Sequence, residues 1–273
     1  DEMARYHRGH DSQVITAFFQ DADSLILPVA ELLEILKHLG EAFPSLTRIT
    51  SYARAKSLKR KSVTSLKALK AAGLTRIHTG LESGSVKVLK LTQKGESPEE
   101  MIEGGQRVMA AGMELSEYIM PGVGGMELSR ENALETAHVL NRIRPDFIRV
   151  RTFALPPDSP MERMADAGRF TPMNELEIVA EIRELLRHLE EMPTHFRCAD
   201  FSLNLLMHVD GYLDRDRSRM LEDLDSFLSL SELDQKSYVL LQRSGHYGVD
   251  PSEMLNHPDL MSQLHNKIEE LDG

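Results

Sequence analysis

Cysteine and aromatic residues are scarce in this 273-residue sequence, which has one cysteine, no tryptophan and only 5% aromatic residues. A single cysteine, Cys198, excludes an internal disulfide framework and any metal site built from several cysteines of this chain. A lone cysteine most often serves as a small buried apolar residue, and we expect this of Cys198. The scarcity of cysteine also fits a reducing compartment, so we expect a cytoplasmic protein.

Long apolar runs and an excess of positive charge are also absent. No stretch approaches the ~20 apolar residues that a membrane-spanning helix needs. The chain has 32 Lys and Arg against 43 Asp and Glu, a net charge of −11. Proteins that bind nucleic acid generally carry a basic surface, so we do not expect a nucleic-acid partner. The basic run at 54–61 is interpreted as a solvated helix entrance.

Short apolar runs alternate with helix-like segments between residues 13 and 155. We expect strands at 14–19, 46–52, 74–79, 114–120 and 147–153. The first run is apolar enough to be buried on both faces, which is typical of a parallel strand. The alternation predicts an α/β fold with a parallel sheet and right-handed crossovers. Five strands are too few for a closed eight-stranded barrel, so we expect an open, partial (βα)6-type barrel that lacks its first strand.

Capping residues predict where several helices begin. Ser97, Pro98 and Glu100 form a capping box with proline at the first helical position. Ser62 and Ser129 are expected to cap two further helices in the same way.

The strand pattern fades in the last third of the chain. The segments 175–190, 214–229 and 231–243 have the apolar spacing of amphipathic helices. We therefore divide the chain into a partial-barrel core, residues 1–165, and a helical C-terminal extension, residues 166–273.

The segments that follow the predicted strands are polar or rich in glycine. They are 20–23, 51–54, 80–84, 121–125 and 149–151. Ligands of parallel α/β proteins bind at the carboxyl ends of the strands. Carboxylates and arginines there would suit a ligand with both an ammonium and a carboxylate, because arginine binds carboxylate in a bidentate manner. Two alternatives remain open: the charges pair with one another, and the glycine segment is a plain turn.

Six short sequences follow one another in order across residues 13–165: FQDAD, TSYAR, GLESGS, KG, MPGVGG and PDFIR. This ordered series resembles the radical S-adenosylmethionine (SAM) superfamily, in the branch near oxygen-independent coproporphyrinogen oxidase and Elongator-type sequences. The resemblance implies a partial six-stranded barrel, a [4Fe–4S] cluster and SAM as cofactor. It also implies an oxidoreductase in which a reduced cluster cleaves SAM to a 5′-deoxyadenosyl radical. The expected partners are an unknown substrate, such as a small molecule, and an external one-electron reductant.

The resemblance implies which residues bind SAM. Gln20, Asp21 and Asp23 replace a glycine-rich segment that meets the methionyl amino group, although QDAD departs from the usual Gly-Gly-Glu. Glu82 and Ser83 fall where the family contacts the methionyl or ribose part. Residues expected near the adenine and ribose are Tyr118, Met120, Gly122, Gly124 and Gly125. Further cavity residues are Tyr52 and Arg54, and those facing the methionyl carboxylate or the substrate are Arg149 and Arg151.

The cysteines of the family are missing from this sequence. The family holds its cluster with Cys-x3-Cys-x2-Cys, and thiolates are the ligands that such a cluster requires. We therefore expect no metal ligand in this chain and place the cluster cysteines upstream of Asp1. The complete protein would then be an enzyme, and these residues alone would be inactive. Two alternatives are a cluster-free scaffold or binding module, and a phosphate-binding barrel enzyme that uses the glycine segment.

Overall fold

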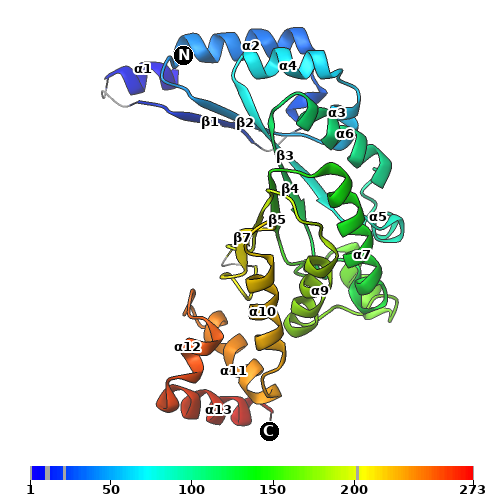
Figure 1. The fold of residues 1–273 in the computed structure, drawn as a ribbon, viewed down its shortest axis with the longest axis vertical. Helices are drawn as coiled ribbons and strands as arrows, with labels where there is room; N and C mark the ends of the chain where they lie inside the picture. Colours follow the sequence, from blue (N-terminus) through cyan, green and yellow to red (C-terminus); the bar gives the residue numbers. More distant parts are fainter. Residues whose placement is uncertain (1, 10–12, 21–22, 201–202, 273) are drawn as a thin grey trace. The chain divides into compact units, whose positions relative to one another are not determined.

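A computed structural model describes residues 2–9, 13–20, 23–200 and 203–272. Its strands are β1 (Thr16–Phe19), β2 (Arg48–Tyr52), β3 (Leu74–Glu82), β4 (Glu114–Ile119), β5 (Phe147–Val150), β6 (His195–Arg197) and β7 (Asp210–Tyr212). Its helices are α1 (Glu2–Gly9), the 3-10 helix η1 (Ser24–Ile26), α2 (Val29–Ala42), α3 (Ala55–Lys59), α4 (Val63–Ala71), α5 (Val86–Leu91), α6 (Pro98–Ala110), α7 (Gly125–Ile143), α8 (Pro160–Asp166), α9 (Glu175–His188), α10 (Arg217–Leu228), α11 (Glu232–Arg243), α12 (Pro251–Leu255) and α13 (Pro258–Asp272). Figure 1 follows these elements along the chain.

The strands form a seven-stranded sheet in the order in which they occur along the chain. β1 pairs in parallel with β2, and β2 in parallel with β3, so that Tyr52 lies opposite His78. β6 and β7 are antiparallel. The predicted α/β class with an open, mostly parallel sheet is confirmed, as are the five strands of the core. The two added strands have three residues each, too few to give a recognisable periodic pattern.

The described chain divides into two compact units that are each assembled from separate stretches. Unit 1 comprises residues 1–81, 95–118 and 139–147, and unit 2 comprises residues 82–94, 119–138 and 148–273. These units are defined by spatial contacts, so the expected division into a core of residues 1–165 and an extension of residues 166–273 stays a prediction.

Unit 1 is built from helices that pack in pairs. α2 lies beside α4 (Figure 1), and both helices bury leucines, which are Leu32, Leu36, Leu66 and Leu69. α3 packs on α6. A Cβ at Gly104 of α6 would lie 2.9 Å from the carbonyl oxygen of Ala55, which is why α6 has glycine at this close approach.

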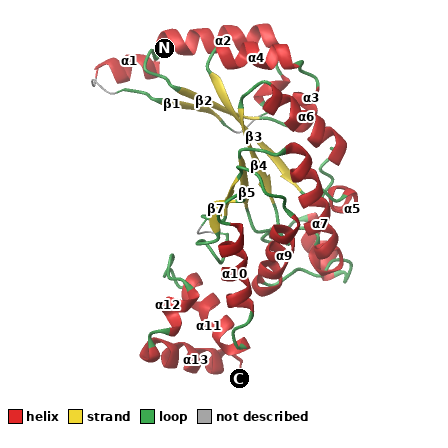
Figure 2. Cartoon of the chain, in the orientation of Figure 1, coloured by secondary structure: helices red, strands yellow, loops and turns green. Residues whose placement is uncertain are grey.

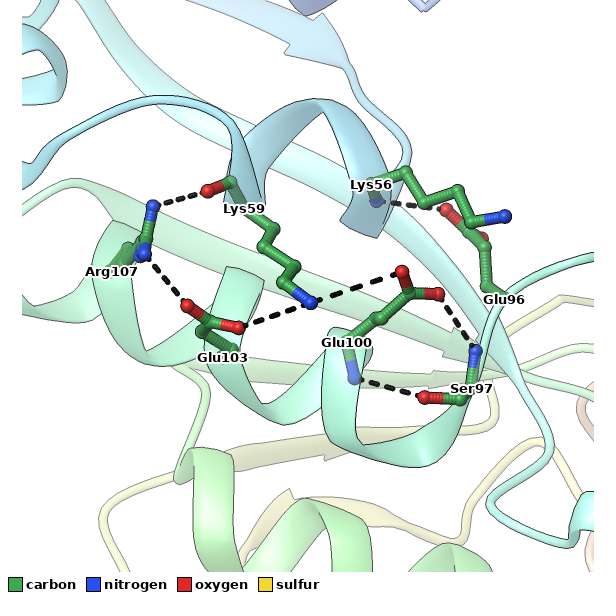
Figure 3. Close-up of polar contacts among 7 residues, drawn as sticks. All are labelled: Lys56, Lys59, Glu96, Ser97, Glu100, Glu103 and Arg107. Carbon is green, nitrogen blue, oxygen red and sulfur yellow. Dashed lines mark hydrogen bonds and ion pairs between the residues drawn. The ribbon is translucent and has the colours of Figure 1, made fainter.

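Charged groups also join α3 to α6 (Figure 3). Lys59 Nζ lies 3.4 Å from Glu103 Oε2, and Arg107 donates to Glu103 and to the carbonyl oxygen of Lys59. The backbone amide of Lys56 donates to Glu96 over 3.0 Å. These contacts fix the short α3, which has only five residues and could not be stable as an isolated helix.

Two of the three predicted helix caps are confirmed. Ser62 accepts the backbone amide of Ser65, and Ser97 forms the complete capping box with Glu100. The prediction for Ser129 is wrong, because α7 already begins at Gly125. The glycine turn leads directly into the helix, four residues before the predicted cap.

The C-terminal part of unit 2 is mostly helical: the helices predicted at 175–190, 214–229 and 231–243 are present as α9, α10 and α11, and the unpredicted strands β6 and β7 lie between α9 and α10. α9 packs on α10 and α11 packs on α13 (Figure 2). Across the described residues, no helix is both long enough and apolar enough to pass through a lipid bilayer.

Candidate functional site

The carboxyl ends of β3, β4 and β5 lie side by side in unit 2. The backbone amide of Met120, just after β4, donates to the carbonyl oxygen of Glu82 at the end of β3 over 2.9 Å. The amide of Arg151, after β5, donates to the carbonyl oxygen of Ile119 over 2.9 Å. The structure thus brings together three of the segments in which the sequence predicts a ligand site.

Glu82 has an uncommon backbone conformation and a side chain that lies beside a cation. Its φ of 61° lies in the left-handed region, which a residue other than glycine seldom adopts and which concentrates at functional sites. Lys94 Nζ lies 2.5 Å from Glu82 Oε1, so the two side chains form an ion pair. A carboxylate accepts about four hydrogen bonds, and acceptor capacity therefore remains beyond this pair.

The segment 83–85 turns tightly into α5. Ser83 Oγ accepts the amide of Ser85, and Ser85 Oγ accepts two amides of the first turn of α5 and donates to Glu131 over 2.7 Å. A Cβ at Gly84 would lie 2.2 Å from the carbonyl oxygen of Glu135, so this position demands glycine. Packing against α7 therefore accounts for the second glycine of the sequence GLESGS.

The glycine segment is a turn in which three of the backbone amides are already used. Gly122 N donates to Glu181 over 3.1 Å, Val123 N to the carbonyl oxygen of Met120, and Gly125 N to that of Gly122. A phosphate cradle requires such amides to point at the ligand. This geometry does not support the alternative of a phosphate-binding barrel enzyme.

Backbone conformation and close packing account for Gly122 and Gly125, whereas the packing at Gly124 is only tight. Gly122 and Gly125 have φ of 88° and 63°. A Cβ at Gly125 would lie 2.6 Å from the Phe170 ring, and one at Gly124 would lie 3.2 Å from Val88. The predicted roles of Gly122, Gly124 and Gly125 near the adenine stay predictions.

Glu181 is a residue of this region that the sequence analysis missed. It lies on α9, is 4% exposed, and accepts hydrogen bonds from Gly122 and from Asn132 Nδ2. The signal in the sequence was a carboxylate on the apolar stripe of α9, between Ile178 and Leu185. An acidic residue at such a position is buried and therefore needs partners.

Unit 1 presents a row of aromatic rings across β1 to β4. The ring centroids of Tyr52 and Tyr118 are 6.5 Å apart, and His78 stacks on Tyr118 at 5.6 Å. Phe18, which the sequence analysis did not select, lies 4.8 Å from the Tyr52 ring. His78 is buried, as expected of a core histidine. The structure thus brings Tyr52 and Tyr118 together, and their contact with SAM stays a prediction.

The charged residues after β1 and β2 contact one another within unit 1. Asp23 accepts the backbone amide of Arg54 over 3.1 Å and the hydroxyl of Ser57 over 2.5 Å. Arg54 Nε lies 3.5 Å from Glu96 Oε1. Protein partners therefore account for these charges, which favours the alternative of mutual pairing at this end of α3.

The remaining predicted residues have varied surroundings. Gln20 is exposed, and Asp21 lies outside the described residues. Arg149 is half-buried in β5, and the Nε atom of Arg151 lies 3.9 Å from Asp200 Oδ2. None of these positions tests the predicted contact with a methionyl group.

The one thiol of the chain is unsuited to a metal cluster. Cys198 is 2% exposed, and burial, with a smaller contribution from the charge of Asp210, raises the pKa of its thiol far above the usual range. Metal clusters bind the thiolate, which this environment disfavours. Within the described ranges, no three His, Cys, Asp or Glu side chains are grouped so that they could hold a metal ion.

Comparison with known proteins gives a consistent family. A family model described as the radical SAM superfamily matches residues 1–137. The tRNA uridine(34) acetyltransferase of Methanocaldococcus infernus is 26% identical over 111 residues, 40% of this chain and 21% of that protein. The structure of archaeal Methanocaldococcus infernus Elp3 with an N-terminal deletion is similar with a TM-score of 0.54 and 16% identity, over 80% of this chain and 56% of that chain. Coproporphyrinogen III oxidase from Escherichia coli, described as a radical SAM enzyme, has a TM-score of 0.47 and 16% identity, over 67% of this chain and 50% of that chain.

These matches differ in what they support. The chain spans about a fifth of the length of the curated relative and just over half of the solved Elp3 chain. At 16% identity, the likeness to Elp3 supports the fold alone. The family match reaches residue 137 and includes the ends of β3 and β4, where Glu82 and Met120 meet.

Proposed function

Because the chain belongs to the radical SAM superfamily, we propose that it binds SAM at the carboxyl ends of its strands and orients this cofactor as part of a radical SAM oxidoreductase. The observation that carries the proposal is the contact between Glu82 and Met120, 2.9 Å from amide to carbonyl, within the matched residues. It joins the two segments that the family resemblance assigns to SAM.

The chemistry of Glu82 suits a cofactor with an ammonium group and ribose hydroxyls. The pair with Lys94 holds the carboxylate in place, and its remaining lone pairs can accept hydrogen bonds from either donor. The left-handed φ of Glu82 directs the chain into the turn at 83–85. Glu82 would therefore bind the methionyl or ribose part of SAM, and Ser83 would shape the turn behind it.

The [4Fe–4S] cluster of the family does not fit the residues of this chain. Such a cluster requires several thiolates, and the chain offers one thiol that is buried and protonated. We therefore assign no electron-transfer step to these residues. Their part is to bind SAM, to orient it and to exclude water around it.

The same observation favours a second candidate of another class. A cluster-free binding module would keep the SAM site and lack the redox chemistry. The two candidates share the prediction that this chain binds SAM, and they differ in whether a cluster and a one-electron reductant ever act on it. A small molecule remains the proposed substrate, because the net charge of −11 does not favour RNA.

Titration calorimetry of the 273-residue chain with SAM tests the proposal. We expect saturable binding, and we expect the Glu82→Ala variant to bind at least tenfold more weakly. The matched control is Glu269→Ala, an exposed carboxylate near the C-terminus of α13 that should leave the affinity unchanged. An absence of binding to the wild-type chain at millimolar SAM would overturn the proposal.

A further inference from the structure

A buried carboxylate of α9, that of Glu181, is hydrogen-bonded to the glycine turn. Glu181 Oε1 accepts the backbone amide of Gly122 over 3.1 Å and Asn132 Nδ2 over 2.8 Å. Gly122 sits so close to α9 that a Cβ there would lie 2.9 Å from Ile178 Cδ1. The turn is therefore fixed to α9 both by packing and by a hydrogen bond.

The contacts continue along α7 to the other turn of the proposed site. Thr136 lies one helical turn after Asn132, and its hydroxyl donates to Asn132 Oδ1 over 3.5 Å. The same hydroxyl oxygen accepts the backbone amide of Gly84 over 2.9 Å. Three side chains thus connect the amide of Gly122 to the amide of Gly84.

Glu181 and Asn132 also line a small cavity with Glu82 and Met120. The second carboxylate oxygen of Glu181 is buried and makes no hydrogen bond to a described group. Burial raises the pKa of Glu181, an effect that the nearby Ser129 hydroxyl and the donors Gly122 and Asn132 partly offset. The network residues therefore share a cavity with Glu82 and Met120, whose contact joins the ends of β3 and β4.

A carboxylate at this position is not what the stability of α9 alone would select. Ile178, Val179, Ile182 and Leu185 form the buried stripe of the helix, and a leucine at 181 would continue it. Burying a carboxylate costs free energy unless its hydrogen bonds offset the loss of water. The hydrogen bonds that Glu181 makes lead to the two turns, which indicates a role in positioning them.

We propose that Glu181 is a positioning residue, which fixes the Gly122 turn relative to the Gly84 turn through Asn132 and Thr136 and thereby shapes the SAM site. The link between the turns stands on the geometry above. The effect on SAM rests on the proposed function. Glu181 lies outside the residues that the family model matches, so this role belongs to the chain's own second half.

Hydrogen exchange measured by mass spectrometry on the full chain tests the link. In Glu181→Leu we expect amide exchange at 80–86 and at 120–126 to rise about tenfold or more. Glu181→Gln keeps an acceptor for Gly122 and Asn132, so it should exchange as the wild type does. Glu184→Leu, on the same helix and outside the network, is the matched control and should also match the wild type. Faster exchange confined to 120–126 would overturn the proposed link.

SAM titration of the same variants tests the consequence for the site. We expect Glu181→Leu to bind SAM at least tenfold more weakly and Glu181→Gln to stay within about threefold of the wild type. If the wild-type chain binds no SAM, the proposed function fails. The hydrogen-exchange data still test whether Glu181 connects the Gly122 turn to the Gly84 turn. If Glu181→Leu binds SAM as tightly as the wild type, the positioning role is overturned and the proposed function stands.

A second variant covers the case in which Glu181→Leu does not fold. Thr136→Val preserves the shape of the side chain and removes the acceptor for Gly84 while leaving Glu181 in place. We expect faster exchange at 80–86 and weaker SAM binding in this variant. Unchanged exchange at 80–86 in Thr136→Val would contradict the network at its other end.

Discussion

Three carboxylates of the described chain are engaged by defined protein partners. Glu82 pairs with Lys94, Asp23 accepts from Arg54 and Ser57, and Glu181 accepts from Gly122 and Asn132. The structure separates these roles by exposure, because the half-buried carboxylate of Glu82 can accept a further hydrogen bond from a ligand, whereas Glu181 is buried. The sequence could nominate Glu82 and Asp23 from their places after strands, and it could not assign their partners.

The pH dependence of stability at Glu181 follows from its burial. Its pKa in the folded chain is raised above the ordinary value of 4.5, chiefly by desolvation. The stability from this group is therefore full below the unfolded pKa and is lost as the pH rises through the folded pKa. Glu181→Gln cannot ionise. We therefore expect its free energy of unfolding to increase relative to that of the wild type as the pH rises from about 4 to 8. Urea denaturation across this range measures the difference, and two parallel curves would contradict the assignment.

Gly84 should tolerate no side chain. We expect Gly84→Ala to reduce the free energy of unfolding by about 1–3 kcal/mol or more, because its Cβ would lie 2.2 Å from the carbonyl oxygen of Glu135. Gly40→Ala is the matched control, since nothing lies within 4 Å of a Cβ at that exposed position of α2. The control should be neutral or stabilising by about 0.5–1 kcal/mol. Equal effects in the two variants, measured by denaturation, would exclude the close approach.

Helices and strands were predictable where the deciding residues are neighbours in sequence. The capping box at Ser97 and Glu100 and the cap at Ser62 depend on side chains within three residues of the helix start, and both are present. The prediction for Ser129 was wrong because α7 begins at Gly125, where the amide of the next residue, Met126, donates to the distant carbonyl oxygen of Thr171. Long-range contacts of this kind are invisible in a local pattern.

The capping box gives a prediction at the scale of one helix. Ser97→Ala removes the acceptor for the amide of Glu100, so we expect a loss of about 1 kcal/mol of folding free energy. The matched control is Ser218→Ala on α10, an exposed serine that caps no helix. Thermal denaturation checks both variants, and a melting temperature of Ser97→Ala equal to that of the wild type would contradict the prediction.

For the whole molecule, the alternation of strands and helices was enough to predict the open α/β sheet. The ordered sequences after the strands were enough to predict the family. The network from Gly84 to Glu181 was not predictable, because its members are up to 97 positions apart and meet only in the folded unit. The aromatic ring of Phe18 was missed for the same reason, since its neighbours come from other strands.

The cysteine content predicts the result of cluster reconstitution. When the 273-residue chain is incubated without oxygen with iron and sulfide, we expect less than one [4Fe–4S] cluster per chain and no 5′-deoxyadenosine after reduction, because a single buried thiol cannot replace several thiolates. Iron and sulfide analysis and chromatography of the products measure this. Formation of a full cluster together with 5′-deoxyadenosine would contradict the conclusion that these residues carry no electron-transfer step.

Because Cys198 is buried, the reactivity of its thiol can report local opening of the protein. Because it is the chain's one cysteine and is 2% exposed, a thiol reagent can react with the native protein only when this part of unit 2 opens. The labelling rate then measures how often that opening occurs, without an added probe. A ligand that stabilises the closed unit should slow the labelling, so SAM and each candidate substrate can be ranked by how long they protect one sulfur atom.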